Sequence, residues 1–423
     1  MDGINVVDKK KVLTQDTRVK EWGIKGDKDS IRKTIEETTE YPMMYKALGT
    51  EPQSKHPYNL YNDIHNQAKF LENTLTTIPS EIRTLANEII ERKINKIIGI
   101  GMGTSQFIAL AVAPIFWKWA GIEAVDMDSC EAIVNDRVMD KRTAFFAYSG
   151  SGTTTDTING TKKAQENGAF TIAITSVAGS PLTKITDRTI VVCAETYDTG
   201  GSDTFHYTTR LAIVIYLALE LGKQLRPDKF DFKKIEKELL QIPKFMASIF
   251  NQISARCWSI AKYHKNARSI IIVGSGPNYG TAEEIGLKFD EMAHIPTNAM
   301  VPTRHIHGAL GLTNEKILTI ILVPTNDPAM KWLNQIADAT VLLKSPAVGI
   351  VSESETEIAD KMDYVVRIPT DSPELFTLLA ILPGQLLAYF FAVEQGDINP
   401  DCQRSNIPRH TKIWLKLFPP GTH

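Results

Sequence analysis

The stretch that decides the fold is KIIGIGMGTS (96–105), a short isoleucine-rich run that ends in a glycine turn. Such a run predicts a buried parallel strand followed by a sharp turn and a helix. The run SIIIVGSG (269–276) repeats this order, and Gly274-Ser275-Gly276 lies 173 residues after Gly101-Met102-Gly103. The spacing therefore predicts a duplicated, open α/β sheet.

Three further apolar runs follow each of these strands. They are AFFAYSG, FTIAITS and TIVVCAE in the first half, and LTIILVPT, AVGIVSES and YVVRIPT in the second. Segments with helical periodicity separate the runs, so the sequence predicts four parallel strands in each half. In such sheets, ligands bind where the strands end, beside the N-termini of the following helices.

Changes in composition predict four regions along the chain. Residues 1–62 are expected to form an N-terminal arm, 63–225 the first repeat, 226–266 a helical connector, and 267–423 the second repeat with a C-terminal tail. The tail is expected to fold over the bound substrate and exclude water. A loosely held terminus is the alternative for the tail.

Composition excludes several classes of protein. The 423 residues are 43% apolar and 23% charged, as in globular proteins. Lys and Arg number 47 and Asp and Glu number 49, so no bulk positive field favours nucleic acid or an anionic membrane. An anionic ligand must therefore be held by local groups.

Cysteine usage and the terminus favour a cytoplasmic protein. Cys130, Cys193, Cys257 and Cys402 form no C-x-x-C pair, which argues against a zinc site or a disulfide framework. The N-terminus is polar and lacks the apolar stretch of a secretion signal. The apolar stretch 376–393 is interrupted by Pro383 and Gly384, so we expect a buried helix rather than a membrane span.

A hydroxyl-rich loop at residues 149–157, called here the anion loop, follows the run AFFAY. It has six hydroxyl side chains in nine residues, at Ser149, Ser151, Thr153, Thr154, Thr155 and Thr157. Glycines allow close approach of a ligand, hydroxyls donate hydrogen bonds, and a helix N-terminus adds positive charge. These features predict a site for a tetrahedral oxyanion, to which the Gly103-Thr104-Ser105 turn can add a hydroxyl.

The anion loop has one alternative interpretation, and it does not match two known phosphate-binding motifs. The hydroxyls are also suited to capping a helix without binding a ligand. The loop is not a Walker motif, and the glycines near Gly101 match a dinucleotide fingerprint poorly. The second half has Pro324-Thr325-Asn326-Asp327-Pro328 at the corresponding place, so we expect one anion site per chain.

Taken together, the Gly-Met-Gly-Thr-Ser turn, the Ser-Gly-Ser-Gly-Thr-Thr loop and the duplication resemble the double-SIS (sugar isomerase) family, over about residues 96–409. The chain is most similar to the isomerase half of glucosamine-6-phosphate synthase and to galactosamine-6-phosphate isomerase/deaminase enzymes. The resemblance implies two tandem SIS domains of flavodoxin-like, doubly wound parallel architecture after an N-terminal helical arm. No glutaminase segment is present, so ammonia transfer from glutamine is not expected.

The resemblance also implies roles for individual residues. Glu291 matches the family's glutamate base, Lys288 the lysine of the same helix, and His307 the histidine linked to ring opening, while Arg409 falls near a lysine that lies over the substrate. The segment from Glu195 to Gly201 and Asn399-Pro400-Asp401 resemble the deaminase branch. The expected substrate-binding residues are Gly103, Thr104, Ser105, Ser149, Gly150, Ser151, Thr153, Thr154, Glu195 and Arg304.

Some positions depart from the family pattern. Asp203, Phe205 and His206 replace a serine and a threonine-lysine pair, and Arg304-His305-Ile306 replaces the usual glutamate-leucine-lysine. These changes affect the contacts to the C2 substituent of the sugar, which the sequence leaves open as amino or hydroxyl.

The residues assigned to catalysis suit the chemistry of aldose–ketose interconversion. On a helix, Glu284, Lys288 and Glu291 share one face, where a solvated Glu–Lys pair is the alternative interpretation. A base must move a proton between C1 and C2, which suits Glu291, and an acid-base group must open the ring, which suits His307. Lys288 or Arg409 would stabilise the enediolate. No metal and no cofactor are expected.

The leading hypothesis is therefore an isomerase of a hexose with a terminal tetrahedral anion, most often a 6-phosphate. Alternatives are a sulfoquinovose isomerase that uses the same site, an amino-sugar-6-phosphate deaminase, and a sensor that binds sugar phosphates without turnover. The family usually completes its sites across a two-fold interface. The resemblance thus implies a homodimer or higher homo-oligomer with His307 donated by the neighbouring subunit.

Overall fold

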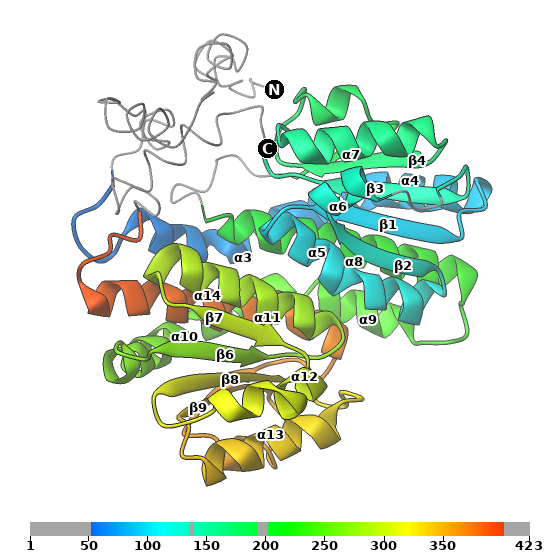
Figure 1. Cartoon of the computed structure of the whole chain (residues 1–423). Coiled ribbons are helices and arrows are strands. Elements are labelled where there is room, and N and C mark those ends of the chain that lie inside the picture. Colours follow the sequence, from blue (N-terminus) through cyan, green and yellow to red (C-terminus); the bar gives the residue numbers. More distant parts are fainter. Residues whose placement is uncertain (1–51, 136–138, 193–201, 402–423) are drawn as a thin grey trace, which may run out of the picture.

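Two five-stranded parallel sheets make up the computed structural model, which describes residues 52–135, 139–192 and 202–401 (Figure 1). Their strand orders are β2-β1-β3-β4-β5 and β10-β9-β8-β6-β7. Within each repeat, the order is that of flavodoxin-like sheets. The predicted duplication of a doubly wound α/β unit, preceded by N-terminal helices, is confirmed.

The elements have the following bounds. The strands are β1 (Lys96–Gly101), β2 (Glu123–Asp128), β3 (Thr143–Tyr148), β4 (Phe170–Thr175), β5 (Arg188–Val191), β6 (Ser269–Val273), β7 (Thr297–Met300), β8 (Ile317–Val323), β9 (Ala347–Ser352) and β10 (Tyr364–Ile368). The helices of the first repeat and the connector are α3 (Asn59–Thr77), α4 (Pro79–Glu91), α5 (Thr104–Ile115), the π-helical turn η2 (Phe116–Ala120), α6 (Ser129–Val134), α7 (Thr155–Glu166), η3 (Leu182–Lys184), α8 (Thr204–Leu225), α9 (Phe232–Leu239) and α10 (Ile242–His264). Those of the second are α11 (Pro277–Lys288), the π-helical turn η4 (Phe289–Ala293), α12 (Pro302–His307), η5 (Ala309–Leu312), α13 (Met330–Leu342), η6 (Ala359–Lys361) and α14 (Pro373–Gln395).

The predicted number of strands was wrong. All eight predicted strands are present, but each sheet has a fifth strand at one edge, β2 in the first and β7 in the second. The sequence of β2, EAVDMD, contains three acidic residues, and β7 has only four residues, TNAM. An edge strand is paired on one side only and tolerates polar residues, so neither segment has a continuous apolar run.

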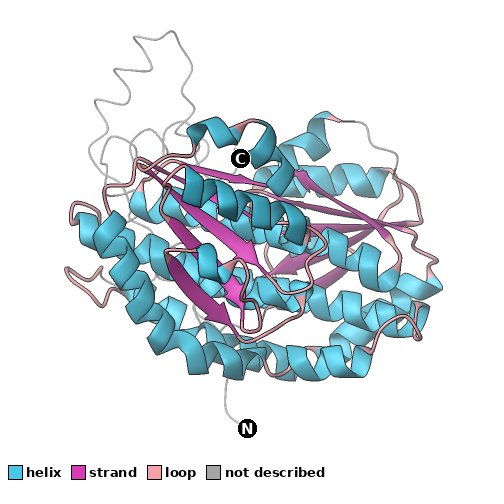
Figure 2. Ribbon diagram, turned by 90° about the horizontal axis from the view of Figure 1, so that it is seen from below, coloured by secondary structure: helices cyan, strands magenta, loops and turns pink. Residues whose placement is uncertain are grey.

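Alternation along the strands fills three hydrophobic cores. In the first sheet, Ile97 and Phe146 face a central core that both repeats share, while Ile98 and Phe145 face an outer core under α6 and α7. In the second sheet, Ile270 faces the central core and Ile271 faces another outer core under α13. Both faces of each sheet are covered by helices, which explains why the strands are apolar throughout (Figure 2).

Helices α5, α8, α11 and α14 lie between the two sheets and join the repeats (Figure 1). Helices α5 and α11 approach so closely at Gly280 that a Cβ atom there would lie 2.6 Å from the backbone nitrogen of Ala111. Only glycine permits this contact between two helix backbones. The first helices of the two repeats are therefore in direct contact.

The predicted buried helix at 376–393 is confirmed as α14. It is long and apolar enough to cross a membrane by composition, but 94% of its apolar window is buried inside the protein. Its first turn is stabilised by Ser372, whose Oγ accepts a hydrogen bond from the Leu375 amide at 3.3 Å. The burial is that of a core helix.

Candidate active site

The turns after β1 and β3 lie side by side because these strands pair in parallel. In the first turn, Gly103 has a φ of +53°, a left-handed value that favours glycine, and Thr104 and Ser105 begin α5. In the second turn, the anion loop connects β3 to α7. The predicted hydroxyl residues are thus brought together at the carboxyl edge of the first sheet.

Hydroxyls of the anion loop bond to one another and to the loop backbone. Ser149 Oγ lies 3.1 Å from Thr154 Oγ1 and accepts a hydrogen bond from the Gly152 amide at 3.1 Å. Ser151 Oγ lies 2.7 Å from Thr153 Oγ1. Thr154 is the N-cap residue of α7, but its side chain makes no capping hydrogen bond. Thr154 thus does not cap α7 through its side chain, and the hydroxyls line the loop as a cradle.

Arg210 of α8 is a residue of this edge that the sequence analysis missed. Its guanidinium is fully buried and donates to Ser105 Oγ at 2.8 Å and to the His206 carbonyl at 3.0 Å, and it also pairs with Asp203. The missed signal is a lone arginine just before an uncharged apolar run, from Leu211 onward, because a buried arginine requires partners.

The predicted Glu284, Lys288 and Glu291 form one connected cluster. Lys288 is fully buried, and its Nζ lies 2.8 Å from Glu291 Oε2 and 3.3 Å from Glu284 Oε1. The same Nζ donates to Thr104 Oγ1 at 3.3 Å and to the Ser202 carbonyl. Thr104 also donates to Glu284 at 3.3 Å. The interpretation of a solvated surface pair is therefore wrong, because the lysine is buried between the two repeats.

Glu291 lies in the π-helical turn η4 rather than in α11 itself. Its side chain is 23% exposed, whereas those of Glu284 and Lys288 are completely buried. The predicted apolar stripe beside them, Ile285, Phe289 and Met292, is also buried. Of the three ionisable residues of this cluster, Glu291 is thus the one that a ligand can reach.

Burial and charge set the protonation states of the cluster. Burial raises the pKa of Glu284 to about 8, against the opposing effect of Lys288, so this acid is mostly protonated at neutral pH. Burial opposes the charged form of Lys288, but the neighbouring carboxylates outweigh it and raise its pKa. Lys288 is therefore a cation at neutral pH, and its Nζ lies 2.8 Å from Glu291 Oε2.

Asp203 balances the charge of Arg210. Burial favours its neutral form, but the Arg210 guanidinium, with weaker contributions from His206 and Lys288, holds the pKa of Asp203 below its usual range. The carboxylate is 27% exposed, while Arg210 is fully buried. The pair is therefore ionised at neutral pH and adds little net charge to the edge.

Arg304 and His307 are not joined to this cluster within one chain. Both lie on α12 of the second repeat and are exposed. Arg304 lies close enough to Tyr279 and Glu283 of α11 to affect their pKa values. The neighbouring His305 is buried, with its Nε2 3.0 Å from Thr313 Oγ1. The exposure of His307 leaves it accessible to another copy of the chain.

Two predicted site residues, Glu195 and Arg409, lie outside the described residues. Gly150 of the anion loop is held by its backbone, since its carbonyl accepts hydrogen bonds from the Ser176 amide at 3.0 Å and from Thr175 Oγ1 at 3.2 Å. Ser176 Oγ in turn lies 2.9 Å from Nδ1 of His206, one of the residues that depart from the family pattern. His206 therefore supports the anion loop.

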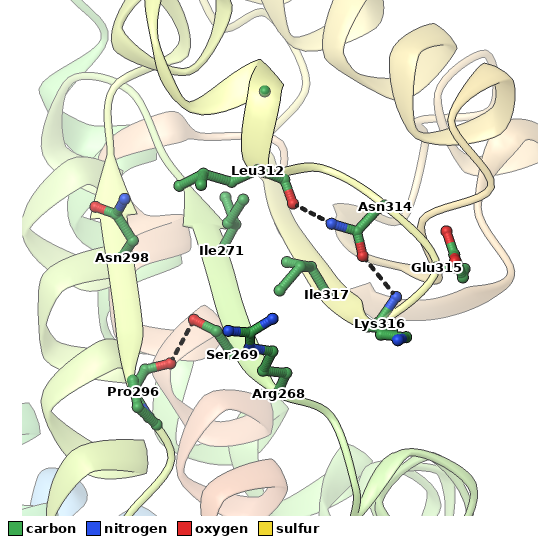
Figure 3. A pocket seen from close by; sticks show the side chains of 11 residues that line it. Arg268, Ser269, Ile271, Pro296, Asn298, Leu312, Asn314, Glu315, Lys316 and Ile317 are labelled. Carbon is green, nitrogen blue, oxygen red and sulfur yellow. Dashed lines mark hydrogen bonds between the residues drawn. The ribbon is translucent and has the colours of Figure 1, made fainter.

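A cavity of about 630 Å³ lies elsewhere, at the amino ends of β6, β7 and β8 (Figure 3). It is lined by Arg268, Ser269, Ile271, Pro296, Asn298, Gly311, Leu312, Asn314, Glu315, Lys316 and Ile317. None of the predicted site residues lines it, and it opens on the opposite edge of the sheet from the carboxyl ends. Within the described ranges, no three His, Cys, Asp or Glu side chains are arranged to hold a metal ion.

Comparisons with known proteins agree with this architecture. The glutamine–fructose-6-phosphate aminotransferase (isomerizing) of Thermococcus kodakarensis is 29% identical over 362 residues, which cover 85% of this chain and 59% of that protein. The C-terminal domain of glucosamine-fructose-6-phosphate aminotransferase from Francisella tularensis superposes with a TM-score of 0.74 at 20% identity, covering 81% of this chain and 98% of that one. Tagatose-6-phosphate ketose/aldose isomerase from Escherichia coli gives 0.70 at 18% identity, covering 83% and 98%.

The chain thus spans less than two thirds of the Thermococcus relative. The two solved structures share its fold at low identity. Residues 90–219 and 265–394 each match the SIS domain, one in each repeat. Because these two matches include more than half of the sequence and coincide with the two sheets, the chain belongs to the SIS domain family.

Proposed function

We propose that the protein is an aldose–ketose isomerase that acts on a hexose 6-phosphate through a cis-enediol intermediate. The observation that supports this most directly is the buried Lys288, which contacts Glu291 at 2.8 Å and Thr104 at 3.3 Å. Thr104 is next to Ser105 on α5, so the residues that hold the reachable carboxylate lie beside one hydroxyl of the cradle. An acyclic sugar fixed at one end by its phosphate would present its other end to that carboxylate.

In this proposal, Glu291 removes the proton from C2 of the aldose and returns it to C1 of the ketose. Lys288 remains charged at neutral pH and stabilises the negative charge that develops on the enediolate oxygen. Ser105, Ser149, Ser151, Thr153 and Thr154, with the backbone of Gly103 and Gly150, bind the phosphate. Glu195 and Arg409 complete the contacts to the sugar, together with Arg304, which lies on α12 with His307 and would come with it from the neighbouring subunit.

His307 opens the sugar ring, and it does so from a neighbouring subunit. Its exposure on α12 and its separation from the Glu291 cluster support this arrangement. A homodimer would then contain two sites, each with Glu291 from one chain and His307 from the other.

Subunit mixing tests this arrangement. Glu291→Gln and His307→Ala are each expected to be inactive alone, whereas a dissociated and reassociated equal mixture should recover about a quarter of the wild-type activity, because half the dimers have one intact site. A mixture that stays inactive while heterodimers are detected would refute the donation of His307 in trans.

A substrate panel tests the reaction itself. Fructose 6-phosphate, tagatose 6-phosphate, glucosamine 6-phosphate and sulfoquinovose would be incubated with the protein in D₂O, and deuterium incorporation beside the carbonyl followed by NMR. Incorporation with a phosphorylated hexose supports the proposal, and preference for sulfoquinovose would assign a sulfonate as the anion. Release of ammonium would instead indicate a deaminase. Tight sugar-phosphate binding without any exchange would indicate a sensor.

A further inference from the structure

Each of the three guanidinium nitrogens of Arg210 donates to a protein group. Nε donates to the His206 carbonyl at 3.0 Å, Nη1 to Ser105 Oγ at 2.8 Å, and Nη2 pairs with Asp203. The side chain has no exposed surface. A ligand therefore does not reach Arg210, and any effect of this residue on binding must pass through the groups that it holds.

The contact with Ser105 fixes the direction of a proton. A guanidinium has five N–H donors and no acceptor, so in this contact Ser105 Oγ can only accept. The Ser105 hydroxyl hydrogen must then point away from Arg210. In the described part of the chain, Ser105 Oγ donates to no protein acceptor. Ser105 is thus left with a hydrogen available for a ligand, unlike the Ser149 and Thr154 hydroxyls, one of which donates to the other at 3.1 Å.

Arg210 also lies against the anion loop. A Cβ atom on Gly150 would lie 3.6 Å from Arg210 Nη2 and 3.5 Å from Asp203 Oδ1. The guanidinium thus spans the space between the first turn of α5 and the Gly150 backbone, and it holds the two phosphate-binding segments at a fixed spacing. Asp203 neutralises its charge, so orientation rather than net charge is what Arg210 contributes.

We propose that Arg210 is a positioning residue for anion binding, which orients the Ser105 hydroxyl so that it donates its hydrogen to the terminal oxyanion of the substrate. This inference rests on the proposed function, since it assigns a terminal anion to the cradle. It predicts that the contribution of Arg210 to anion affinity depends on Ser105.

A double-mutant cycle with inorganic phosphate as the probe tests this. Phosphate affinity would be measured by calorimetry for the wild type, Arg210→Gln, Ser105→Ala and the double variant. Each single change is expected to weaken binding roughly tenfold, the usual effect of losing one hydrogen bond to a charged group, and the double variant no more than Ser105→Ala alone. Arg226→Gln, at the other end of α8, is the matched control, expected to bind as the wild type does.

Several outcomes would overturn the proposal. They are unchanged affinity in Arg210→Gln, an equal further loss in the Ser105→Ala background, or no phosphate binding by the wild type. Arg210→Lys keeps a cationic donor and should recover part of the affinity, which keeps the test valid if Arg210→Gln fails to fold. A merely structural Arg210 would lower thermal stability without coupling to Ser105.

The proposed reaction is judged separately. With a turned-over sugar phosphate, Arg210→Gln should raise KM and leave kcat unchanged, because the reacting carbons lie at the other end of the substrate. A fall in kcat at constant KM would contradict the positioning role. Phosphate binding with the expected coupling but no turnover of any sugar would refute the isomerase while leaving the role of Arg210 intact.

Discussion

Each repeat follows its first helix with a π-helical turn, η2 in the first and η4 in the second, and equivalent residues of the two turns are 173 positions apart. At the same position of the turn, the first repeat has Lys118 and the second has Glu291. Lys118 reaches the helix that closes the other repeat, whereas Glu291 is linked to the residue before the corresponding helix only through Lys288. Lys118 Nζ lies 2.5 Å from Glu374 at the start of α14, and Glu291 is held by Lys288, which reaches Ser202 just before α8.

The two sheet edges near these turns carry different polar side chains. The first repeat has the hydroxyl cradle and the buried Arg210. The second has a buried carboxylate, Asp327, whose Oδ2 accepts a 2.5 Å hydrogen bond from Ser275 and whose pKa is raised by burial. The residue that reaches this edge from the other repeat is the cation Lys118. The duplicated backbone supplies the geometry twice, and the hydroxyl-rich loop of the first edge is why we propose anion binding at that edge only.

Glu291→Gln should produce the largest effect. Loss of the proposed base is expected to lower kcat by about a thousandfold, as general acid-base groups commonly contribute, while sugar-phosphate binding persists. Steady-state kinetics and isotope exchange would measure this. Asp290→Asn is the matched control, because it lies in the same turn but bonds to Thr297. Near-normal turnover by Glu291→Gln would show that Glu291 is not the base, so the two turns would not differ in catalysis.

Glu284→Gln should change how stability depends on pH. The carboxyl titrates near its ordinary 4.5 when unfolded and about 8 when folded, so the folded protein binds more protons between these values. The free energy of unfolding of the wild type should therefore fall as pH rises through this window, by on the order of a few kcal/mol. Glutamine mimics the protonated acid and should abolish that slope.

Thermal melts at several pH values would measure the effect of Glu284→Gln, with the exposed Glu166→Gln as control. If the stability of Glu284→Gln relative to the wild type does not increase with pH, another group is responsible for the pH dependence. The equivalent position in the first repeat is Ala111, so only one of the two α5–α11 partners brings an ionisable group to the contact.

Ser149→Ala and Thr325→Ala compare the two loops directly. Removal of Ser149 is expected to raise KM for a phosphosugar roughly tenfold, because one hydrogen bond to the anion is lost. Thr325, in the corresponding loop of the second repeat, bonds to Ser354 at 2.8 Å and should leave KM unchanged. Equal effects in the two loops would contradict the assignment of the anion site to the first repeat.

Lys118→Met should have the smallest effect. The lysine side chain is 43% exposed, so its ion pair with Glu374 is expected to contribute about 1 kcal/mol or less to stability. Urea denaturation would detect the loss, and kcat should not change. Lys233→Met, an exposed lysine of α9, is the control. A large fall in kcat would show that the second edge also takes part in the reaction.

Much of the fold could be predicted because it depends on simple periodicity. Buried parallel strands such as β1 and β6 are apolar on both faces and stand out in the sequence. β2 and β7 could not be recognised, since an edge strand needs no apolar run. The glycine turns were visible for a similar reason, as only glycine adopts the backbone of Gly103 and Gly276.

The site was predicted less completely. The spacing of Glu284, Lys288 and Glu291 indicated a shared face, but not that Lys288 would be buried against Thr104 of the other repeat. Arg210 escaped notice because its partners Asp203, His206 and Ser105 are brought to it by the packing of α8 on α5, and no local pattern encodes this contact. Glu195, Arg409 and the trans position of His307 stay predictions.

The missing side chain at Gly280 has a consequence for motion. With the backbones of α5 and α11 in contact, the repeats cannot rock apart as two lobes around a hinge without breaking the junction that also keeps Lys288 against Thr104. We therefore expect the spacing between the anion loop and Glu291 to change little when a ligand binds. In the proposed reaction, a sugar would enter and leave at the rim of the site, because the packed α5–α11 junction forms its floor.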